Sequence, residues 1–386
     1  MKVLFLSHYH KDVEEVRQLA TELRLHGIVP WIDKDGGFNL GDNNEDKARR
    51  VIQEESFGLI LYATGNVFDS PFINRVEIQA AKSMKKQDPQ FLLVAIPRSI
   101  DFADLEKLST KHFHFNLSDF HSIEIPRGID IKPKFGEISR HILSCILKKS
   151  IHQINGRFSM QVCTREMLPD EKDDTLCVDA RQLFLTEHGL QQNWPHFLQG
   201  LRDVKKEIAS QYGRPRLKIH GSKHLTAAFL VGRVFSPFQL AIRQGNELWM
   251  SDGHCQSSSF QIETLEGAED STDLSIEISI TKRVSSAAER TISQKFRPCK
   301  RIQYVLTENS ATIDGNCCRD VVQKITSQIT NMVGIMDIKT IHIFAAVPQG
   351  LMMMLGREFG ALPSVQLYEY DGNRYLPSIL VPSGAL

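Results

Sequence analysis

Two segments of this 386-residue sequence repeat one pattern at a fixed distance, and this repeat limits the possible folds more than any other feature. Residues 217–249 align with residues 341–373 without a gap at an offset of 124, so that Gly232 meets Gly356. Each copy is predicted to form a strand, a loop, a helix, a glycine and a second strand. A period of this kind indicates a repeated supersecondary unit.

A further strand and helix are predicted upstream of each copy. The strands cover residues 183–187 and 304–308, both ending in Leu-Thr-Glu, and the helices cover residues 194–210 and 318–333. The two βαβαβ units, at 183–249 and 304–373, imply two Rossmann-like halves related by a pseudo-twofold axis. Their strand ends are expected to form one shared pocket. A near-symmetric pocket suits a ligand that is itself built of repeating parts.

The first 150 residues alternate between short apolar runs and amphipathic segments. Strands are predicted at residues 2–6, 28–32, 57–62, 91–96 and 111–117, and helices at residues 13–23, 43–54, 70–84 and 135–148. This alternation predicts an α/β fold with a flavodoxin-like parallel sheet covered on both faces. Ligands of such sheets bind beyond the carboxyl ends of the strands. The loops expected there are residues 7–12, 33–42 and 63–70.

One carboxylate stands inside the apolar stripe of the helix that follows the third strand. The helix begins at Ser70-Pro71, a capping hydroxyl followed by the residue best suited to the first helical position. Its buried face is predicted to hold Ile73, Val76, Ala80, Ala81 and Met84. Glu77 lies within that stripe. It is either a functional carboxylate held at the sheet edge or a marginal glutamate whose head reaches water.

Composition excludes several classes of function. Forty-six Lys and Arg balance forty-six Asp and Glu, so no broad positive field favours duplex DNA, RNA or an anionic membrane. No apolar run is long enough to span a bilayer, and the amino terminus lacks the pattern of a signal peptide. Seven cysteines without metal spacing predict reduced cytoplasmic thiols, no metal and no permanent cofactor. No GxGxxG motif follows the first strand, which excludes a Rossmann oxidoreductase.

Residues 1–150 resemble a TIR domain. The resemblance rests on four motifs in order: VLFLSHYHKD, GIVPWID, LGD at residues 40–42, and SPFINRVE. It implies either an adaptor module or an enzyme that cleaves NAD+ into nicotinamide and an ADP-ribose product. The enzymes use a glutamate on the helix after the third strand, which maps onto Glu77. They usually carry an aromatic residue four positions before it, whereas Phe72 lies five positions before Glu77.

The residue type fits that chemistry, because a fixed carboxylate stabilises the oxocarbenium-like ribose left when nicotinamide departs. The candidate NAD-binding residues are Ser7, His8, Lys11, Phe38, Asp42 and Arg49.

Residues 155–386 resemble a SAVED domain, a fused pair of CARF-like halves that binds cyclic oligonucleotides in bacterial immunity. The clearest local signature is HLTAAFLVG at residues 224–232. The loop before it precedes a helix amino terminus, where backbone N–H groups favour a phosphate. The candidate ligand-binding residues are Thr186, His188, Ser222, Lys223, His224, Thr307, Gln349 and Gly350.

The whole chain thus resembles the TIR–SAVED effectors of cyclic-oligonucleotide-based anti-phage signalling (CBASS). We expect a cytoplasmic NAD+ hydrolase that a cyclic oligonucleotide, such as cyclic tri-AMP, activates by driving self-association through both domains. The glycine-rich loop at residues 33–42 is the expected mobile element. The alternative is a TIR scaffold without catalysis that a nucleotide messenger assembles. A nuclease acting on its own ligand lacks a clustered set of carboxylates or histidines.

Overall fold

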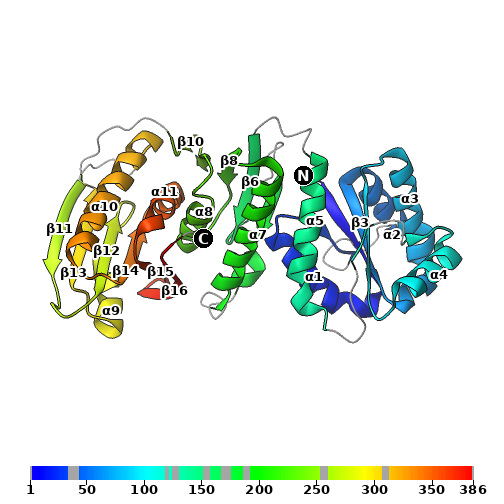
Figure 1. The fold of residues 1–386 in the computed structure, drawn as a ribbon, viewed down its shortest axis with the longest axis horizontal. Coiled ribbons are helices and arrows are strands. Elements are labelled where there is room, and N and C mark those ends of the chain that lie inside the picture. Colours follow the sequence, from blue (N-terminus) through cyan, green and yellow to red (C-terminus); the bar gives the residue numbers. More distant parts are fainter. Residues whose placement is uncertain are drawn as a thin grey trace. The chain divides into compact units, whose positions relative to one another are not determined.

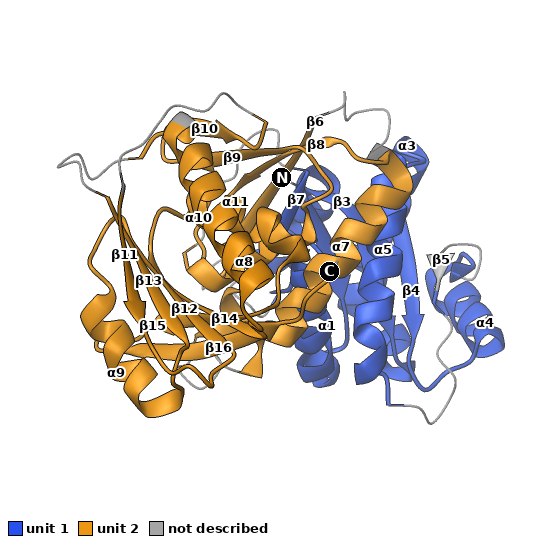
Figure 2. Cartoon of the chain, turned by 60° about the vertical axis from the view of Figure 1, so that its left-hand side comes forward, with its two compact units in different colours: residues 1–154, 170–178 blue, residues 155–169, 179–386 orange. Residues whose placement is uncertain are grey.

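The computed structural model describes residues 2–33, 43–117, 121–123, 130–150, 157–166, 175–185, 192–252, 260–306 and 313–384. The chain forms two compact units, which Figure 2 shows in different colours. Unit 1 comprises residues 1–154 and 170–178, and unit 2 comprises residues 155–169 and 179–386. Within the described ranges, no helix combines the length and the apolar character needed to cross a bilayer.

Unit 1 is a parallel sheet of five strands in the order β2-β1-β3-β4-β5. Its strands are β1 (Val3–Ser7), β2 (Pro30–Trp31), β3 (Ser56–Ala63), β4 (Leu92–Pro97) and β5 (His121–Ser122). Its α-helices are α1 (Val13–Leu25), α2 (Asn44–Arg50), α3 (Ile78–Gln87), α4 (Phe102–Phe113) and α5 (Phe135–Ser150). Helices α1 and α5 cover one face of the sheet, and α2, α3 and α4 cover the other (Figure 1). The predicted parallel α/β fold is confirmed.

The predicted strand at residues 111–117 is wrong. Residues Phe102–Phe113 form α4, which Asp101 caps by accepting a hydrogen bond from the Asp104 N–H at 2.8 Å. Phe113 and Leu117 are both buried, but a helix end and the turn after it place them in the core, so their even spacing imitates a strand. The edge strand β5 follows at His121–Ser122.

The other two sheets are mainly parallel, with the orders β10-β9-β8-β6-β7 and β11-β13-β12-β14-β15-β16, and all of their strands except β7 lie in unit 2. The strands of the first are β6 (Arg157–Cys163), β7 (Leu176–Asp179), β8 (Arg216–His220), β9 (Leu240–Gln244) and β10 (Glu247–Met250). In β7, residues 176–178 belong to unit 1 and Asp179 to unit 2. Those of the second are β11 (Phe260–Glu266), β12 (Asp273–Ser279), β13 (Lys300–Leu306), β14 (Thr340–Ala346), β15 (Ser364–Tyr370) and β16 (Tyr375–Val381). The helices are α7 (Trp194–Tyr212), α8 (Leu225–Val234), α9 (Ser285–Lys295), α10 (Gly315–Ile335) and α11 (Gln349–Glu358). Strands β10, β11 and β16 pair antiparallel at the edges.

The element boundaries of unit 2 follow the offsets of the sequence repeat. Strands β8 and β14 begin at 216 and 340, helices α8 and α11 at 225 and 349, and strands β9 and β15 at 240 and 364. Each pair is 124 positions apart. Helices α7 and α10 begin at 194 and 315, which are 121 positions apart. The upstream strands are β7 and β13, which begin at 176 and 300 and are again 124 positions apart. The strand predicted from residue 183 is wrong, because Arg181–Phe184 form a 3-10 helix. The Phe184 ring packs at 4.3 Å from that of Trp194, which fixes this turn against α7.

Helices α8 and α11 cross through backbone contact at two equivalent glycines. A Cβ on Gly232 would lie 1.8 Å from the carbonyl oxygen of Met353, and a Cβ on Gly356 would lie 2.1 Å from that of Phe229. Phe229 and Met353 are themselves 124 positions apart. The contact therefore maps onto itself when the two copies are exchanged, as a pseudo-twofold axis between α8 and α11 requires.

Candidate active site and candidate ligand pocket

Glu77 is a buried carboxylate at the carboxyl edge of the unit 1 sheet. Its side chain is 5% exposed, and its Oε2 accepts a hydrogen bond from the Ser7 hydroxyl at the end of β1. The predicted apolar stripe surrounds it, since Ile73 and Val76 are also buried. Residues Ile73–Glu77 form a π-helical turn that runs directly into α3. Such turns are frequent at functional sites.

The surroundings of Glu77 favour its neutral form in the free protein. Burial raises the pKa of Glu77 to about 8, the hydrogen bond from Ser7 acts in the opposite direction, and the negative charge of Asp33 raises it further. A carboxyl with a pKa near neutrality can change its protonation state when a cationic ligand arrives. The structure thus contradicts the alternative in which the carboxyl head of Glu77 reaches water.

His8 supplies a second buried polar group at this edge. Its Nδ1 lies 3.1 Å from the carbonyl oxygen of Leu6. Its Nε2 is buried and has no hydrogen-bond partner among the described residues, and it lies 3.9 Å from Oδ1 of Asp33. The loops after β1 and β2 and the helix after β3 therefore bring Ser7, His8, Asp33 and Glu77 to one edge, as expected for ligands of a parallel sheet.

The structure connects the other predicted NAD-binding residues less directly to Glu77. Lys11 is exposed on the turn after β1. Arg49 on α2 donates from Nη2 to the carbonyl oxygen of Arg75 at 3.1 Å, two residues before Glu77. Phe38 and Asp42, with most of the loop at residues 33–42, lie outside the described residues.

Sequence reasoning missed a polar network at the same end of the sheet. The hydroxyl of Tyr62 on β3 donates to Glu15, and Arg98, just after β4, lies 3.3 Å from Glu15 by its Nε. Burial raises the pKa of Tyr62, and the hydrogen bond to Glu15 raises it further. Arg98 follows a strand end directly, so the strand-end rule used for Ser7 is the signal that identifies it.

The predicted ligand residues at the amino end of α8 are mostly engaged within the protein. The Lys223 ammonium, 1% exposed, donates to the carbonyl oxygens of His220 at 3.1 Å and Gly221 at 2.7 Å. Burial lowers the pKa of Lys223 to about 8 and that of His224 to about 4. His224 is therefore neutral at pH 7, and its Nδ1 lies 2.9 Å from the Thr164 hydroxyl. Ser222 is half-buried.

The equivalent end of α11 has a different chemistry. Gln349 is the first residue of that helix, and the backbone N–H of the buried Gly350 donates to Oε1 of Gln244 at 2.9 Å. A Cβ on Gly350 would lie 2.6 Å from the ring of Trp249, so the indole closes this side of the helix end. Thr186, His188 and Thr307 lie outside the described residues.

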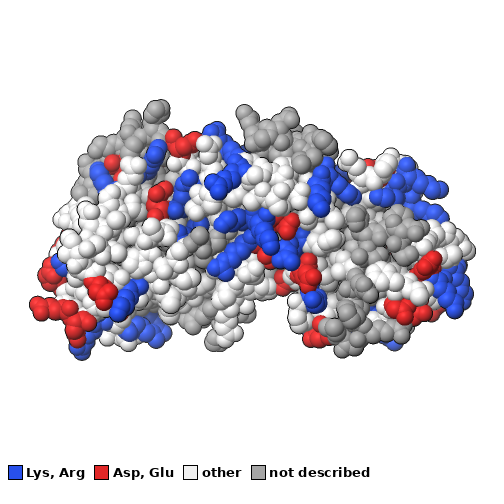
Figure 3. Space-filling model, viewed as in Figure 1, with Lys and Arg blue, Asp and Glu red and all other residues white. Residues whose placement is uncertain are grey.

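Positive charge gathers in one region of unit 2. Figure 3 shows Lys and Arg side chains concentrated around α7. Burial lowers the pKa of Lys205, and the neighbouring Arg202, Arg233 and Arg214 lower it further. Among the described residues, no group of His, Cys, Asp and Glu is arranged to hold a metal ion.

Comparison with known proteins identifies both parts of the chain. A model of the TIR domain family matches residues 4–124, and a model of the SAVED family, the SMODS-associated and fused to various effectors sensor domain, matches residues 200–381. CD-NTase-associated protein 4 of an Acinetobacter species is 21% identical over 192 residues, which cover 48% of this chain and 41% of that protein. The chain thus matches less than half of that relative's length.

Two solved structures share the fold. One is the Acinetobacter baumannii Cap4 SAVED/CARF-domain containing receptor with the cyclic trinucleotide 3'3'3'-cAAA, with a TM-score of 0.53 at 13% identity, covering 96% of this chain and 98% of that one. The other is the same receptor with 2'3'3'-cAAA, with a TM-score of 0.52 at 14% identity, covering 90% and 86%. The two family models show that the chain has an amino-terminal TIR domain and a carboxy-terminal SAVED sensor domain.

Proposed function

We propose that this protein is an NAD+ hydrolase switched on by a cyclic oligonucleotide. The ligand binds the SAVED domain and drives several chains together, and the TIR domains then cleave NAD+ to nicotinamide and ADP-ribose or a cyclised form of it. In a bacterial cytoplasm this activity would deplete NAD+ during infection, as an effector of CBASS. The observation that carries the proposal is the buried Glu77 carboxylate, held by Ser7 at the ligand edge of a TIR sheet.

The proposed reaction breaks the bond between the nicotinamide nitrogen and C1' of the ribose. The electron pair of that bond leaves with the nicotinamide, which becomes neutral, and positive charge develops on the ribose. Ionised Glu77 stabilises this charge, since it stands in a desolvated site where electrostatic interactions are strong. Water then attacks C1' and releases a proton to solvent. A cationic nicotinamide ring beside Glu77 favours the ionised carboxylate on binding.

Each neighbouring residue has a proposed role. Ser7 positions Glu77, and the unpartnered Nε2 of His8 binds the substrate ribose or carboxamide. Lys11 and Arg49 face the pyrophosphate, while Phe38 and Asp42 act from the glycine loop. In the SAVED domain the proposed ring contacts come from both halves: Thr186, His188, Ser222, Lys223, His224, Thr307, Gln349 and Gly350. The 3'3'3'-cAAA bound by the Cap4 receptor supports a cyclic trinucleotide such as cyclic tri-AMP.

The test is nicotinamide release by the purified full chain with cyclic di-, tri- and tetranucleotides. We expect no release without a ring and strong release with a cyclic triadenylate, together with a rise in particle size by light scattering. A rise in size without nicotinamide release would instead establish a scaffold without catalysis. If no ring changes either quantity, the sensor function fails. Burial of Glu77 argues against the scaffold, because an idle buried carboxylate costs stability.

The pH dependence of turnover follows from the pKa of Glu77. At saturating activator, kcat/KM reports the ionisation of the free site. Because the ionised form is active and its pKa is about 8, kcat/KM should rise with pH through about 8 and then level off. Ser7→Ala removes the hydrogen bond that lowers this pKa, so the rise should move to higher pH. A profile that is flat between about pH 6 and pH 9 would contradict the role of Glu77.

A further inference from the structure

The amino end of α8 is already occupied by a carboxylate from the opposite half of unit 2. The backbone N–H of Thr226, the second residue of α8, donates to Oε1 of Glu369 on β15 at 2.7 Å. The Thr226 hydroxyl lies 2.8 Å from that of Ser378 on β16. Glu369 is only 8% exposed. A helix amino end that could receive an external anion is therefore filled by an internal one.

The other helix is capped in the same reciprocal manner. Gly350, 124 positions after Thr226, donates its N–H to Gln244 at the end of β9. Each of the two helices is thus capped by a side chain from the carboxyl end of a strand in the opposite half. The two contacts differ in charge, because one acceptor is the carboxylate Glu369 and the other is the neutral amide Gln244.

Few positive charges compensate Glu369. Arg165 lies 3.9 Å away through its Nη2, but that side chain is 51% exposed. The ammonium of Lys223 is turned onto loop carbonyls, and His224 is neutral. Burial raises the pKa of Glu369, against the hydrogen bonds from Thr226 and the charge of Arg165, which lower it. The positive charge of Arg165 therefore reaches Glu369 only across a long and exposed contact.

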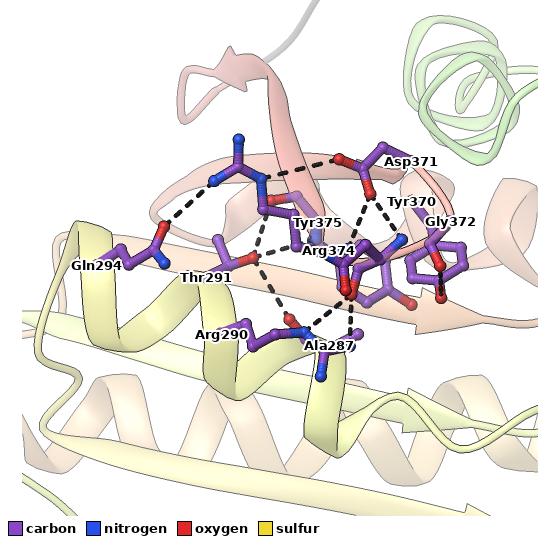
Figure 4. A network of polar contacts seen from close by, with 10 residues as sticks. Ala287, Arg290, Thr291, Gln294, Tyr370, Asp371, Gly372, Arg374 and Tyr375 are labelled. Atoms are coloured by element: carbon purple, nitrogen blue, oxygen red, sulfur yellow. Dashed lines mark hydrogen bonds and ion pairs between the residues drawn. The ribbon is translucent and has the colours of Figure 1, made fainter.

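The turn that follows the strand carrying Glu369 is anchored to a helix. Figure 4 shows the turn between β15 and β16 bound to α9. Thr291 donates to the carbonyl oxygen of Tyr375 at 2.8 Å and accepts from its N–H at 3.1 Å. Arg290 donates from Nε to the carbonyl oxygen of Asn373 at 3.0 Å. Release of Thr226 must therefore come from the Glu369 side chain or from the α8 side of the contact.

We propose that Glu369 is a charged latch between the two SAVED halves, which an oncoming ring phosphate must displace from the amino end of α8. This inference rests on the proposed sensor function. Two anions cannot share the same N–H at close range, so displacement of the carboxylate weakens ligand binding and separates β15 from α8. The latch thereby sets the messenger concentration needed for activation and couples binding to a rearrangement of the two halves.

The test compares Glu369→Gln with the parent chain by calorimetric titration with 3'3'3'-cAAA. The amide can still accept from Thr226 but carries no charge, as Gln244 does in the other half. We expect binding about 5- to 30-fold tighter, because the neutral amide lacks the favourable interaction of an anion with the helix amino end and therefore competes less with the phosphate. The activator concentration for half-maximal nicotinamide release should fall in parallel. Gln244→Glu, which adds a second charged latch, should weaken binding by a similar factor.

Two further arms make the result decisive. A ring of the same size with different bases should show the same gain in Glu369→Gln, because the latch opposes phosphate rather than base. If Glu369→Gln weakens binding of the adenine-containing cyclic trinucleotide alone, Glu369 reads a base. If the variant binds both trinucleotides as the parent does, Glu369 only caps a helix. Either outcome overturns the latch. If the parent chain binds no cyclic trinucleotide, the sensor function and the latch fail together.

Discussion

Glu77→Gln is expected to reduce ligand-stimulated nicotinamide release at least about 100-fold, the loss that follows removal of one preorganised electrostatic group. The amide keeps the shape of the side chain and its contact with Ser7, but it cannot neutralise positive charge on the ribose. Because the effect falls on the transition state, kcat should drop while substrate binding changes little. The measurement is nicotinamide release by chromatography at saturating cyclic trinucleotide.

The same variant carries its own folding control. The pKa of Glu77 lies above its ordinary value of 4.5 in the folded chain, at about 8. The folded parent therefore loses stability as pH rises from about 4.5 to about 8, a loss that the amide cannot show. Glu77→Gln should be at least as stable as the parent at pH 8 by thermal unfolding. If it is well folded and still cleaves NAD+ at the parental rate, Glu77 is not the catalytic residue.

Gly232→Ala is expected to destabilise the SAVED domain by about 3 kcal/mol or more, at the upper end of overpacking effects. The added methyl carbon would lie 1.8 Å from the Met353 carbonyl oxygen, and this neighbour is backbone within a helix, so it cannot turn away. Gly356→Ala should have the same effect through Phe229. Both are measured as the shift of the urea unfolding midpoint of the full chain.

Gly334 provides a matched control for these two variants. It lies in α10, and a Cβ there would meet nothing within 4 Å. Gly334→Ala should therefore leave stability unchanged or raise it by up to about 1 kcal/mol through helix propensity. If Gly232→Ala is as stable as the parent chain, α8 and α11 do not touch through their backbones.

Sequence patterns predicted the parts of this protein that depend on periodicity. The apolar stripe around Glu77 and the strand end at Ser7 were both visible in the sequence, and their meeting follows from the geometry of parallel sheets. The one-residue departure from the TIR pattern also has a structural counterpart. In the π-helical turn the Ile78 N–H donates to Ile73, five residues back, so Phe72 stands one such turn before Glu77.

Other features depend on tertiary contacts that no local pattern encodes. The strand predicted at residues 111–117 failed because a buried helix end can show the same spacing of Phe113 and Leu117 as a strand. Lys223 was predicted to bind a phosphate because it lies just before a helix. Its side chain instead folds back, and its ammonium donates to two backbone carbonyl oxygens. Glu369 was missed altogether, since its partner Thr226 lies 143 positions away in the other half.

The glycine crossing of α8 and α11 also limits how the two SAVED halves can move. Helices in backbone contact cannot slide past one another without collision, but they can rock about the point where they touch. The amino end of each helix bonds to a strand residue of the opposite half, at Glu369 and Gln244. Near the carboxyl ends, Arg233 and Arg357 hold carbonyl groups of the opposite half, at Gly360 and Phe238. A change in the crossing angle that draws the amino ends together around a small ring would therefore also move the arginine ends and alter these two hydrogen bonds.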